Sequence, residues 1–342
     1  MKKHLNTLFV TTQGAYLSAR GETVSVRVEG ETRLRVPLHM LDGIVCFGQV
    51  ACSPALLGLC GEHDVAVSFL SLHGRFLARV QGPVSGNVLL RREQYRRADD
   101  PRATADLART MVLAKVANSR TVLLRGARES KEASDEQTLR QAADRLAALT
   151  LLLETAEDVD RIRGLEGEAA RAYFSVFDRL VGGKPEFRFE KRTRRPPLDP
   201  TNALLSFVYT LLVHDMAAAL ESVGLDPAVG FLHRDRPGRP SLALDLMEEF
   251  RPFFADRLVL SLINRRQVQS QGFTLQESGA VWMDEKTRKT VLTAYQKRKQ
   301  ETIRHPFLGE DTTVGLLFHL QARLLAAHLR DDLDGYPPMI WR

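Results

Sequence analysis

The amino-terminal part of the chain alternates apolar and polar side chains with a period of two. This alternation is clearest over 24–28, and Gly30 separates that run from Leu34 and Val36. A period of two is typical of a half-buried strand, and a glycine between two such runs favours a turn. The pattern predicts a compact sheet with one helix. Besides 24–28, the predicted strands are 5–11, 15–19, 43–47, 65–70 and 75–80, and the helix is 54–62.

After Asn87 the apolar positions recur every three to four residues, the period of helices that bury one face. Charges and a proline interrupt this pattern at 96–101, which indicates a junction, and the Pro-rich segment 182–200 is typical of a loop. The predicted helices are 103–125, 137–157, 161–180, 202–223, 241–256, 285–300 and 312–330. We therefore predict an α+β fold with a β-rich domain at 1–86, a junction at 87–101 and a larger, predominantly α-helical domain at 102–342.

Composition adds a charge bias and a cellular setting. The 48 Lys and Arg exceed the 42 Asp and Glu, so the net charge is +6, which favours a polyanionic partner. Cys46, Cys52 and Cys60 lack the C-x-x-C spacing of a zinc site, so reduced thiols are expected. The start lacks the apolar segment of a signal peptide, and no apolar run looks long enough to cross a bilayer. We predict a cytoplasmic protein without membrane contact.

Acidic residues and one histidine are the candidates for chemistry. Glu166 lies on a predicted helix whose apolar stripe leaves its carboxylate free to point elsewhere. A single glutamate of this kind is more often a solvated residue than a ligand. His233 precedes Asp245, and Glu248 and Glu249 follow Asp245 by three and four residues on another predicted helix. Crowded carboxylates need a cation or arginines to offset their repulsion, so surface ion pairing and metal binding both stay open.

The donor types narrow the choice of metal. Carboxylates favour Mg²⁺ or Mn²⁺, the imidazole suits Mn²⁺, and Zn²⁺ stays arguable. His214 and Asp215 form a rival pair, but their apolar helical context favours a structural histidine. Arginines and lysines surround the acidic segments and favour phosphate contact. The candidate DNA-binding residues are Lys191, Arg192, Arg194, Arg195, Arg234, Arg236 and Arg239.

Three segments together resemble a known family. They are GLEGEAARAYF at 164–174, DPTNALLSF at 199–207 and GFLHRDRPGRPSLALDLMEEFRP at 230–252. In this order they resemble the CRISPR-associated integrase and endonuclease family, the first of the two proteins common to adaptation modules. The resemblance implies that Glu166, His233 and Glu248 bind the metal, with Asp245 as a further acidic site residue and Glu249 as the competitor to exclude.

The resemblance also implies an activity and partners. The family is similar in forming homodimers through its β-rich domains and in joining a small second adaptation protein. The implied reaction is metal-assisted transesterification, in which a 3′-hydroxyl of a captured DNA fragment attacks a phosphodiester of a CRISPR repeat. Two alternatives remain: a metal-dependent nuclease that acts on branched or single-stranded DNA in repair or degradation, and a noncatalytic DNA-binding scaffold.

Overall fold

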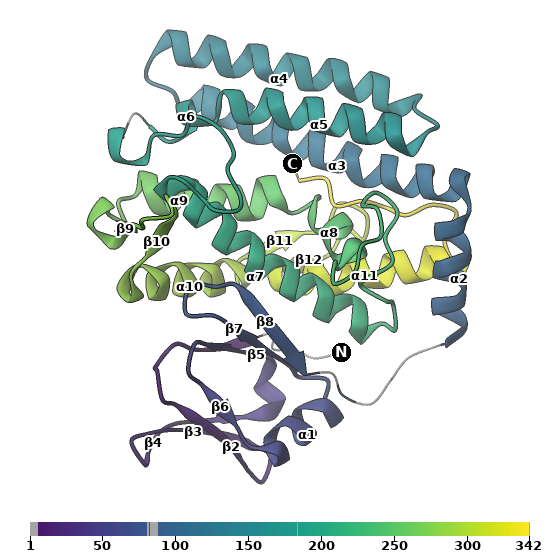
Figure 1. Ribbon diagram of the computed structural model, residues 1–342. Coiled ribbons are helices and arrows are strands. Elements are labelled where there is room, and N and C mark those ends of the chain that lie inside the picture. Colours follow the sequence, from purple (N-terminus) through teal and green to yellow (C-terminus); the bar gives the residue numbers. More distant parts are fainter. Residues whose placement is uncertain (1–5, 81, 83–87, 183, 342) are drawn as a thin grey trace.

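A computed structural model describes residues 6–80, 82, 88–182 and 184–341 of the chain. A strand-rich part is followed by a larger helical part, which confirms the predicted α+β fold (Figure 1). Residue 5 of the first predicted strand lies outside the described residues, as do residues 83–87, across which the predicted boundary at 86 and 87 falls.

The strand-rich part contains two four-stranded sheets and one helix. The first sheet has the order β1-β5-β7-β8, with the first three strands parallel and β8 antiparallel. The second sheet has the order β4-β3-β2-β6, in which only β2 and β6 pair in parallel. The elements are β1 (Asn6–Val10), β2 (Tyr16–Arg20), β3 (Thr23–Val28), β4 (Glu31–Pro37), β5 (Leu41–Phe47), β6 (Ala51–Cys52), α1 (Pro54–Glu62), β7 (Ala66–Leu70) and β8 (Phe76–Val80).

Strand β5 is buried along its whole length because its two faces enter different cores. Ile44 and Cys46 belong to the core of the strand-rich part, whereas Val45 and Phe47 belong to the core of the helical part. The first sheet therefore packs directly on the helices. Gly74 lies at this contact with a φ of +88°, and a Cβ there would come within 2.6 Å of the Phe207 ring. Glycine meets both demands at once.

The helical part consists of long helices with two short hairpins. In Figure 1, α3, α4 and α5 form one layer, and α7 and α11 lie between that layer and the strands. The helices are α2 (Val88–Asp99), α3 (Pro101–Glu129), α4 (Ala133–Glu154), α5 (Val159–Ser175), α6 (Phe177–Leu180), α7 (Pro200–Ser222), α8 (Ser241–Met247), α9 (Arg257–Asn264), α10 (Glu285–Lys299) and α11 (Val314–Leu329). The hairpins are β9 (Phe273–Leu275) with β10 (Val281–Met283), and β11 (Thr302–Arg304) with β12 (Asp311–Thr313).

The chain departs from the predicted elements in two instructive places. The predicted helix 241–256 ends as α8 at Met247, and a π-helical turn over Arg251–Asp256 follows before α9. Pro252 lies in that turn and cannot donate a helical hydrogen bond, which favours the change in geometry. The segment predicted as a junction is instead mostly helical, since α2 occupies Val88–Asp99. Asp100 then begins α3 by accepting hydrogen bonds from the amides of Arg102 and Ala103.

Helix α7 corrects one prediction. Pro200–Ser222 is long and apolar enough to cross a membrane by length and composition, contrary to the expectation that no run has that length. In the structure 61% of its apolar window is buried, and core helices of soluble proteins meet the same criterion. Leu204, Leu212 and Leu220 on this helix are fully buried in the helical core. The apolar sequence of α7 is therefore explained by its central position.

Candidate active site

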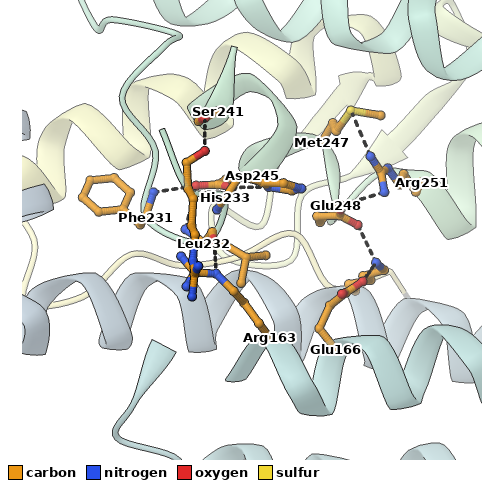
Figure 2. Close-up of polar contacts among 12 residues, drawn as sticks. Arg163, Glu166, Phe231, Leu232, His233, Ser241, Asp245, Met247, Glu248 and Arg251 are labelled. Atoms are coloured by element: carbon orange, nitrogen blue, oxygen red, sulfur yellow. Dashed lines mark hydrogen bonds and ion pairs between the residues drawn. The ribbon is translucent and has the colours of Figure 1, made fainter. Parts of the chain in front are cut away.

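The carboxylates of Glu166 and Glu248, both predicted as metal ligands, face each other across a buried ammonium group. Glu166 lies on α5 and Glu248 directly follows α8. Lys115, on α3, contacts the Oε1 atom of Glu166, and its Nζ atom lies 2.7 Å from Oε2 of Glu248. Arg251 approaches the other oxygen of Glu248 at 2.7 Å (Figure 2). Three separate elements thus bring acids and bases to one point.

The charges at this point compensate one another. Burial by itself raises the pKa of Glu248, but Arg251 and Lys115 outweigh it and hold the pKa at about 2. Burial lowers the pKa of Lys115, but Glu248 and Glu166 raise it above its ordinary value. Glu248 is therefore ionised and Lys115 is protonated near neutral pH. Removal of the charge of Lys115 or of Glu248 would leave this group of charges unbalanced by one.

His233 lies on the loop between α7 and α8 and is held from behind by Asp245. The Nδ1 atom of His233 lies 2.6 Å from Oδ1 of Asp245, and the carboxylate can only accept this hydrogen bond. Asp245 also accepts from the backbone amides of Phe231, Leu232 and His233 at 2.6–2.9 Å. In Figure 2 the His233 ring extends from Asp245 toward the side of Glu248. Asp245 is therefore a positioning residue that leaves the Nε2 atom of His233 free to bind a ligand.

Two further side chains anchor the His233 loop. Gln94 on α2 is fully buried and donates to the carbonyls of Asp226 and Val229 at 2.8 Å each. Arg163 on α5 donates from Nε to the carbonyl of Leu232 at 2.6 Å. A helix of the predicted junction and the helix of Glu166 therefore fix the same loop. The position of His233 depends on contacts that are remote in the sequence.

Glu249 is excluded as a site residue because it faces the other way. Its Oε1 atom accepts from Tyr336 at 2.8 Å, and its Oε2 atom accepts from the Met339 amide at 2.7 Å and from Gln321 at 3.1 Å. Burial raises the pKa of Glu249 to about 7. Glu249 therefore holds the carboxyl-terminal segment, and the neighbouring Glu248 alone faces Glu166.

The donor set suits a divalent metal, although the side chains do not yet surround one. Within the described residues, no three His, Cys, Asp or Glu side chains lie close enough together to hold an ion. The Lys115 ammonium lies between Glu166 and Glu248, where an ion shared by the two would sit. The buried Oε2 atom of Glu248 has the Lys115 ammonium as its close polar neighbour, at 2.7 Å. Two carboxylates and an imidazole fit Mg²⁺ or Mn²⁺ in chemistry.

The predicted basic residues fall into two groups. Arg192 is half-buried and donates to Asn202 at 2.7 Å and to Ser206 at 3.1 Å, so it fixes its own loop. Arg234 pairs with Asp160 at 2.9 Å. The remaining candidates differ in exposure. Lys191, Arg194, Arg195 and Arg236 are exposed, and Arg239 is half-buried.

A groove of about 2210 Å³ connects several of these residues with the site. His233, Arg236 and Arg239 line it from the helical part, and Arg75 and Arg79 line it from the strand-rich part. Its walls therefore carry positive charge from both parts of the molecule. A groove of this kind suits the phosphate backbone of a nucleic acid.

Sequence reasoning did not identify Lys115, Arg251 or Asn202. The sequence did contain a sign of Lys115, because it is a lone lysine within the apolar helical segment MVLAKVA. A lysine that is buried with such a segment needs an acidic partner. Asn202 lies within the motif DPTNALLSF, which gave no sign of its role. Its side chain forms hydrogen bonds with the backbone of Lys191 and Thr193 and so fixes the loop that carries these residues. Arg251 is on the predicted helix, but the π-helical turn decides its direction.

A comparison with protein-family models decides the family. The model described as "CRISPR associated protein Cas1" matches residues 8–297, most of the chain. The chain belongs to the Cas1 family. A Cas1 relative from Chlorobaculum tepidum, named CRISPR-associated endonuclease Cas1 1, is 60% identical over the full length of both chains. One from Rhodospirillum rubrum, named CRISPR-associated endonuclease Cas1 2, is 53% identical over the full length of both. The coarse class is thus that of a CRISPR-associated endonuclease.

Solved Cas1 structures have the same fold. A Cas1 protein from Thermotoga maritima is 25% identical, with a TM-score of 0.82 over 95% of this chain and 97% of its own. A casposase bound to an integration product is 24% identical, with a TM-score of 0.81 over 96% of this chain and 92% of its own. The α+β architecture is therefore confirmed.

Proposed function

We propose that this Cas1 protein is a metal-dependent DNA integrase and endonuclease that inserts DNA fragments as new spacers into a CRISPR array. In the proposed reaction, a 3′-hydroxyl of the fragment attacks a phosphodiester of a repeat. A new phosphodiester bond forms, one P–O bond of the repeat breaks, and the departing oxygen takes up a proton and leaves as the hydroxyl end of the cut repeat strand. One observation carries the proposal: Glu166 and Glu248 meet around one cation position, and His233 extends toward it beside an arginine-lined groove. That arrangement fits chemistry on a phosphodiester.

Glu166, Glu248 and the Nε2 atom of His233 are the proposed ligands of Mg²⁺ or Mn²⁺. When bound, the ion supplies positive charge to the phosphate as negative charge develops on its oxygens. Asp245 keeps the ring of His233 in place, and Arg251 keeps Glu248 ionised. Arg236 and Arg239 line the same groove as His233, and there they would hold the strand by its phosphates.

The proposed partners follow from the family. They are DNA, both as fragment and as CRISPR repeat, a second copy of this chain through the strand-rich part, and a small second adaptation protein. A solved structure of the same fold is described as a Cas6-RT-Cas1–Cas2 complex, and this chain covers 36% of the matched chain in that structure. We propose that this chain also binds a small second adaptation protein. We further propose that it is located in the cytoplasm and does not contact a membrane.

Strand joining tests the proposal. The purified protein, its small adaptation partner and Mn²⁺ are incubated with a fragment that has a free 3′-hydroxyl and with repeat DNA, and joined and cut products are measured. Glu166→Ala and His233→Ala are each expected to reduce joining by about 100-fold or more. DNA affinity should stay nearly unchanged, because phosphate contacts are spread over many basic residues.

Each alternative has its own outcome in this assay. Cleavage without any joining would contradict integration and leave a metal-dependent nuclease of repair or degradation. Neither cleavage nor joining with any divalent metal would leave the noncatalytic DNA-binding scaffold. Glu168→Ala is a matched control, since Glu168 lies on the same helix but pairs with Arg145 on α4. This variant should join strands as the unmodified protein does.

A further inference from the structure

We propose that the Lys115 ammonium is a built-in occupant of the metal position, which a divalent cation displaces when it binds. The inference rests on the proposed function because it concerns the same Glu166 and Glu248 carboxylates. It goes further by assigning a role to a lysine on α3 that lies outside the three motif segments 164–174, 199–207 and 230–252. In the metal-free protein this lysine keeps the two carboxylates together.

The contacts of Lys115 match those expected of a bound cation. Its side chain is 11% exposed and touches one oxygen of Glu166 and one oxygen of Glu248. Oε2 of Glu248 is buried, and its charge is compensated by the Lys115 ammonium at 2.7 Å. A carboxylate oxygen that already pairs with one cation is a ready ligand for another.

Charge balance indicates that Lys115 leaves when a metal enters. Two carboxylates, Glu166 and Glu248, face two cations, Lys115 and Arg251, so the pocket is neutral without an ion. A divalent ion added beside both cations would leave two uncompensated positive charges in a buried place. Like charges at such distances repel strongly when water is excluded. Movement of the ammonium away from the carboxylates halves that excess.

A small cavity can receive the displaced ammonium. It has a volume of about 20 Å³, and its polar lining includes Lys115, Tyr173, Tyr209 and Asp256 together with Arg194 and Arg251. A volume of this size holds about one water-sized group. Asp256 accepts a hydrogen bond from Tyr209 at 2.5 Å and presents a carboxyl group to the cavity. The flexible stem of Lys115 would let its ammonium turn from Glu166 and Glu248 toward Asp256.

Mn²⁺ affinity tests the inference. We would titrate the full-length protein, without DNA, with Mn²⁺ in a calorimeter, and compare it with the Lys115→Met variant. Methionine keeps most of the length of the side chain but removes the competing charge, so Mn²⁺ should bind about tenfold more tightly. Lys299→Met is the matched control, since Lys299 is also buried and pairs with Asp215 at 3.0 Å. Its Mn²⁺ affinity should equal that of the unmodified protein.

The possible results separate this inference from the proposed function. Unchanged or weaker Mn²⁺ binding by Lys115→Met would overturn the displacement of lysine, whether or not the protein joins strands. If that variant does not fold, a structure of the unmodified protein with bound Mn²⁺ shows whether Lys115 has been displaced. Nζ of Lys115 turned toward Asp256 supports the inference, whereas Nζ still between Glu166 and Glu248 overturns it. An absence of Mn²⁺ from these residues would instead contradict the metal dependence of the proposed function.

Discussion

Two adjacent glutamates show how strongly position decides the state of a side chain. Glu248 pairs with Arg251 and Lys115, and its pKa is held at about 2. Glu249 lies among uncharged hydrogen-bond donors, and burial raises its pKa to about 7. The two glutamates are neighbours in the sequence, between Met247 and Phe250. The difference between their pKa values cannot be predicted from the sequence, because it is caused by the groups that folding brings next to each side chain.

The raised pKa of Glu249 predicts a pH dependence of stability. Between its ordinary pKa of 4.5 and about 7, the folded protein keeps a proton that the unfolded chain gives up. The free energy of unfolding should therefore fall as pH rises through this window, by about 3 kcal/mol from this group. Denaturant unfolding at several pH values should show a smaller fall in Glu249→Gln. Asp256, whose pKa burial also raises to about 7, keeps its own contribution in both proteins.

A control isolates this contribution. Glu129→Gln changes an exposed glutamate at the end of α3 and should keep the pH dependence of the unmodified protein. Glu248 acts in a different window, because its lowered pKa adds stability that is lost only as pH falls from 4.5 through about 2. An equal fall in stability for Glu249→Gln and the unmodified protein would contradict the assignment.

At the scale of elements, the carboxyl-terminal segment ties the π-helical turn to α3. Asn118 on α3 donates to the carbonyls of Glu249 and Met339 at 2.7 and 2.8 Å and accepts from the Trp341 amide at 2.7 Å. The Trp341 ring stacks on Phe253 in the turn, at 6.0 Å between centroids. The turn that carries Arg251 is therefore supported by the end of the chain.

Loss of this stack should weaken the molecule. Trp341 also receives the guanidinium of Arg257 over its ring at 4.5 Å, so Trp341→Ala removes two contacts together with buried area. We expect a loss of about 2 kcal/mol in the free energy of unfolding, measured with denaturant. Phe307→Ala is the control, since Phe307 is 53% exposed and lies on the loop between β11 and β12. A loss no larger in Trp341→Ala than in the control would show that the segment is not part of the support.

At the scale of the whole molecule, the groove lies where the strand-rich and helical parts meet. Arg79 on β8 pairs with Glu221 near the end of α7, which joins the two parts across this boundary. The predicted basic residues contribute unequally to the groove. Arg192 lines the groove but is committed to its own loop, whereas Arg236 is exposed and lines the same groove as His233. DNA affinity should therefore depend more on residues such as Arg236.

A salt titration tests the role of the groove. Arg236→Ala combined with Arg239→Ala should weaken DNA binding at every salt concentration and make the plot of log affinity against log salt shallower by about 1.4 to 1.8. Arg128→Ala combined with Arg140→Ala is a matched control, since both arginines are exposed and lie on α3 and α4. An equal change in slope for the two double variants would contradict a DNA path along the groove.

The sequence by itself determined the division into a strand-rich part followed by a helical part, and it gave the main chemical candidates. Periodicity is a local property, so the alternation over 24–28 and the helical period of α3 were sufficient to predict these elements. The segments around Glu166 and His233 were sufficient to recognise the family, because a spaced set of motifs requires no knowledge of contacts. The metal ligands themselves remain a prediction.

Only the tertiary structure decided which charged groups meet. The break after α8 turns Glu248 toward Lys115 and Glu249 toward Tyr336, and neither direction follows from helical spacing. Asp245 was predicted among the acids of the site, yet it faces the loop amides and His233. Lys115 enters the site from α3, 51 residues before Glu166. Burial and the charges of remote neighbours set these states, and both arise only when distant segments pack together.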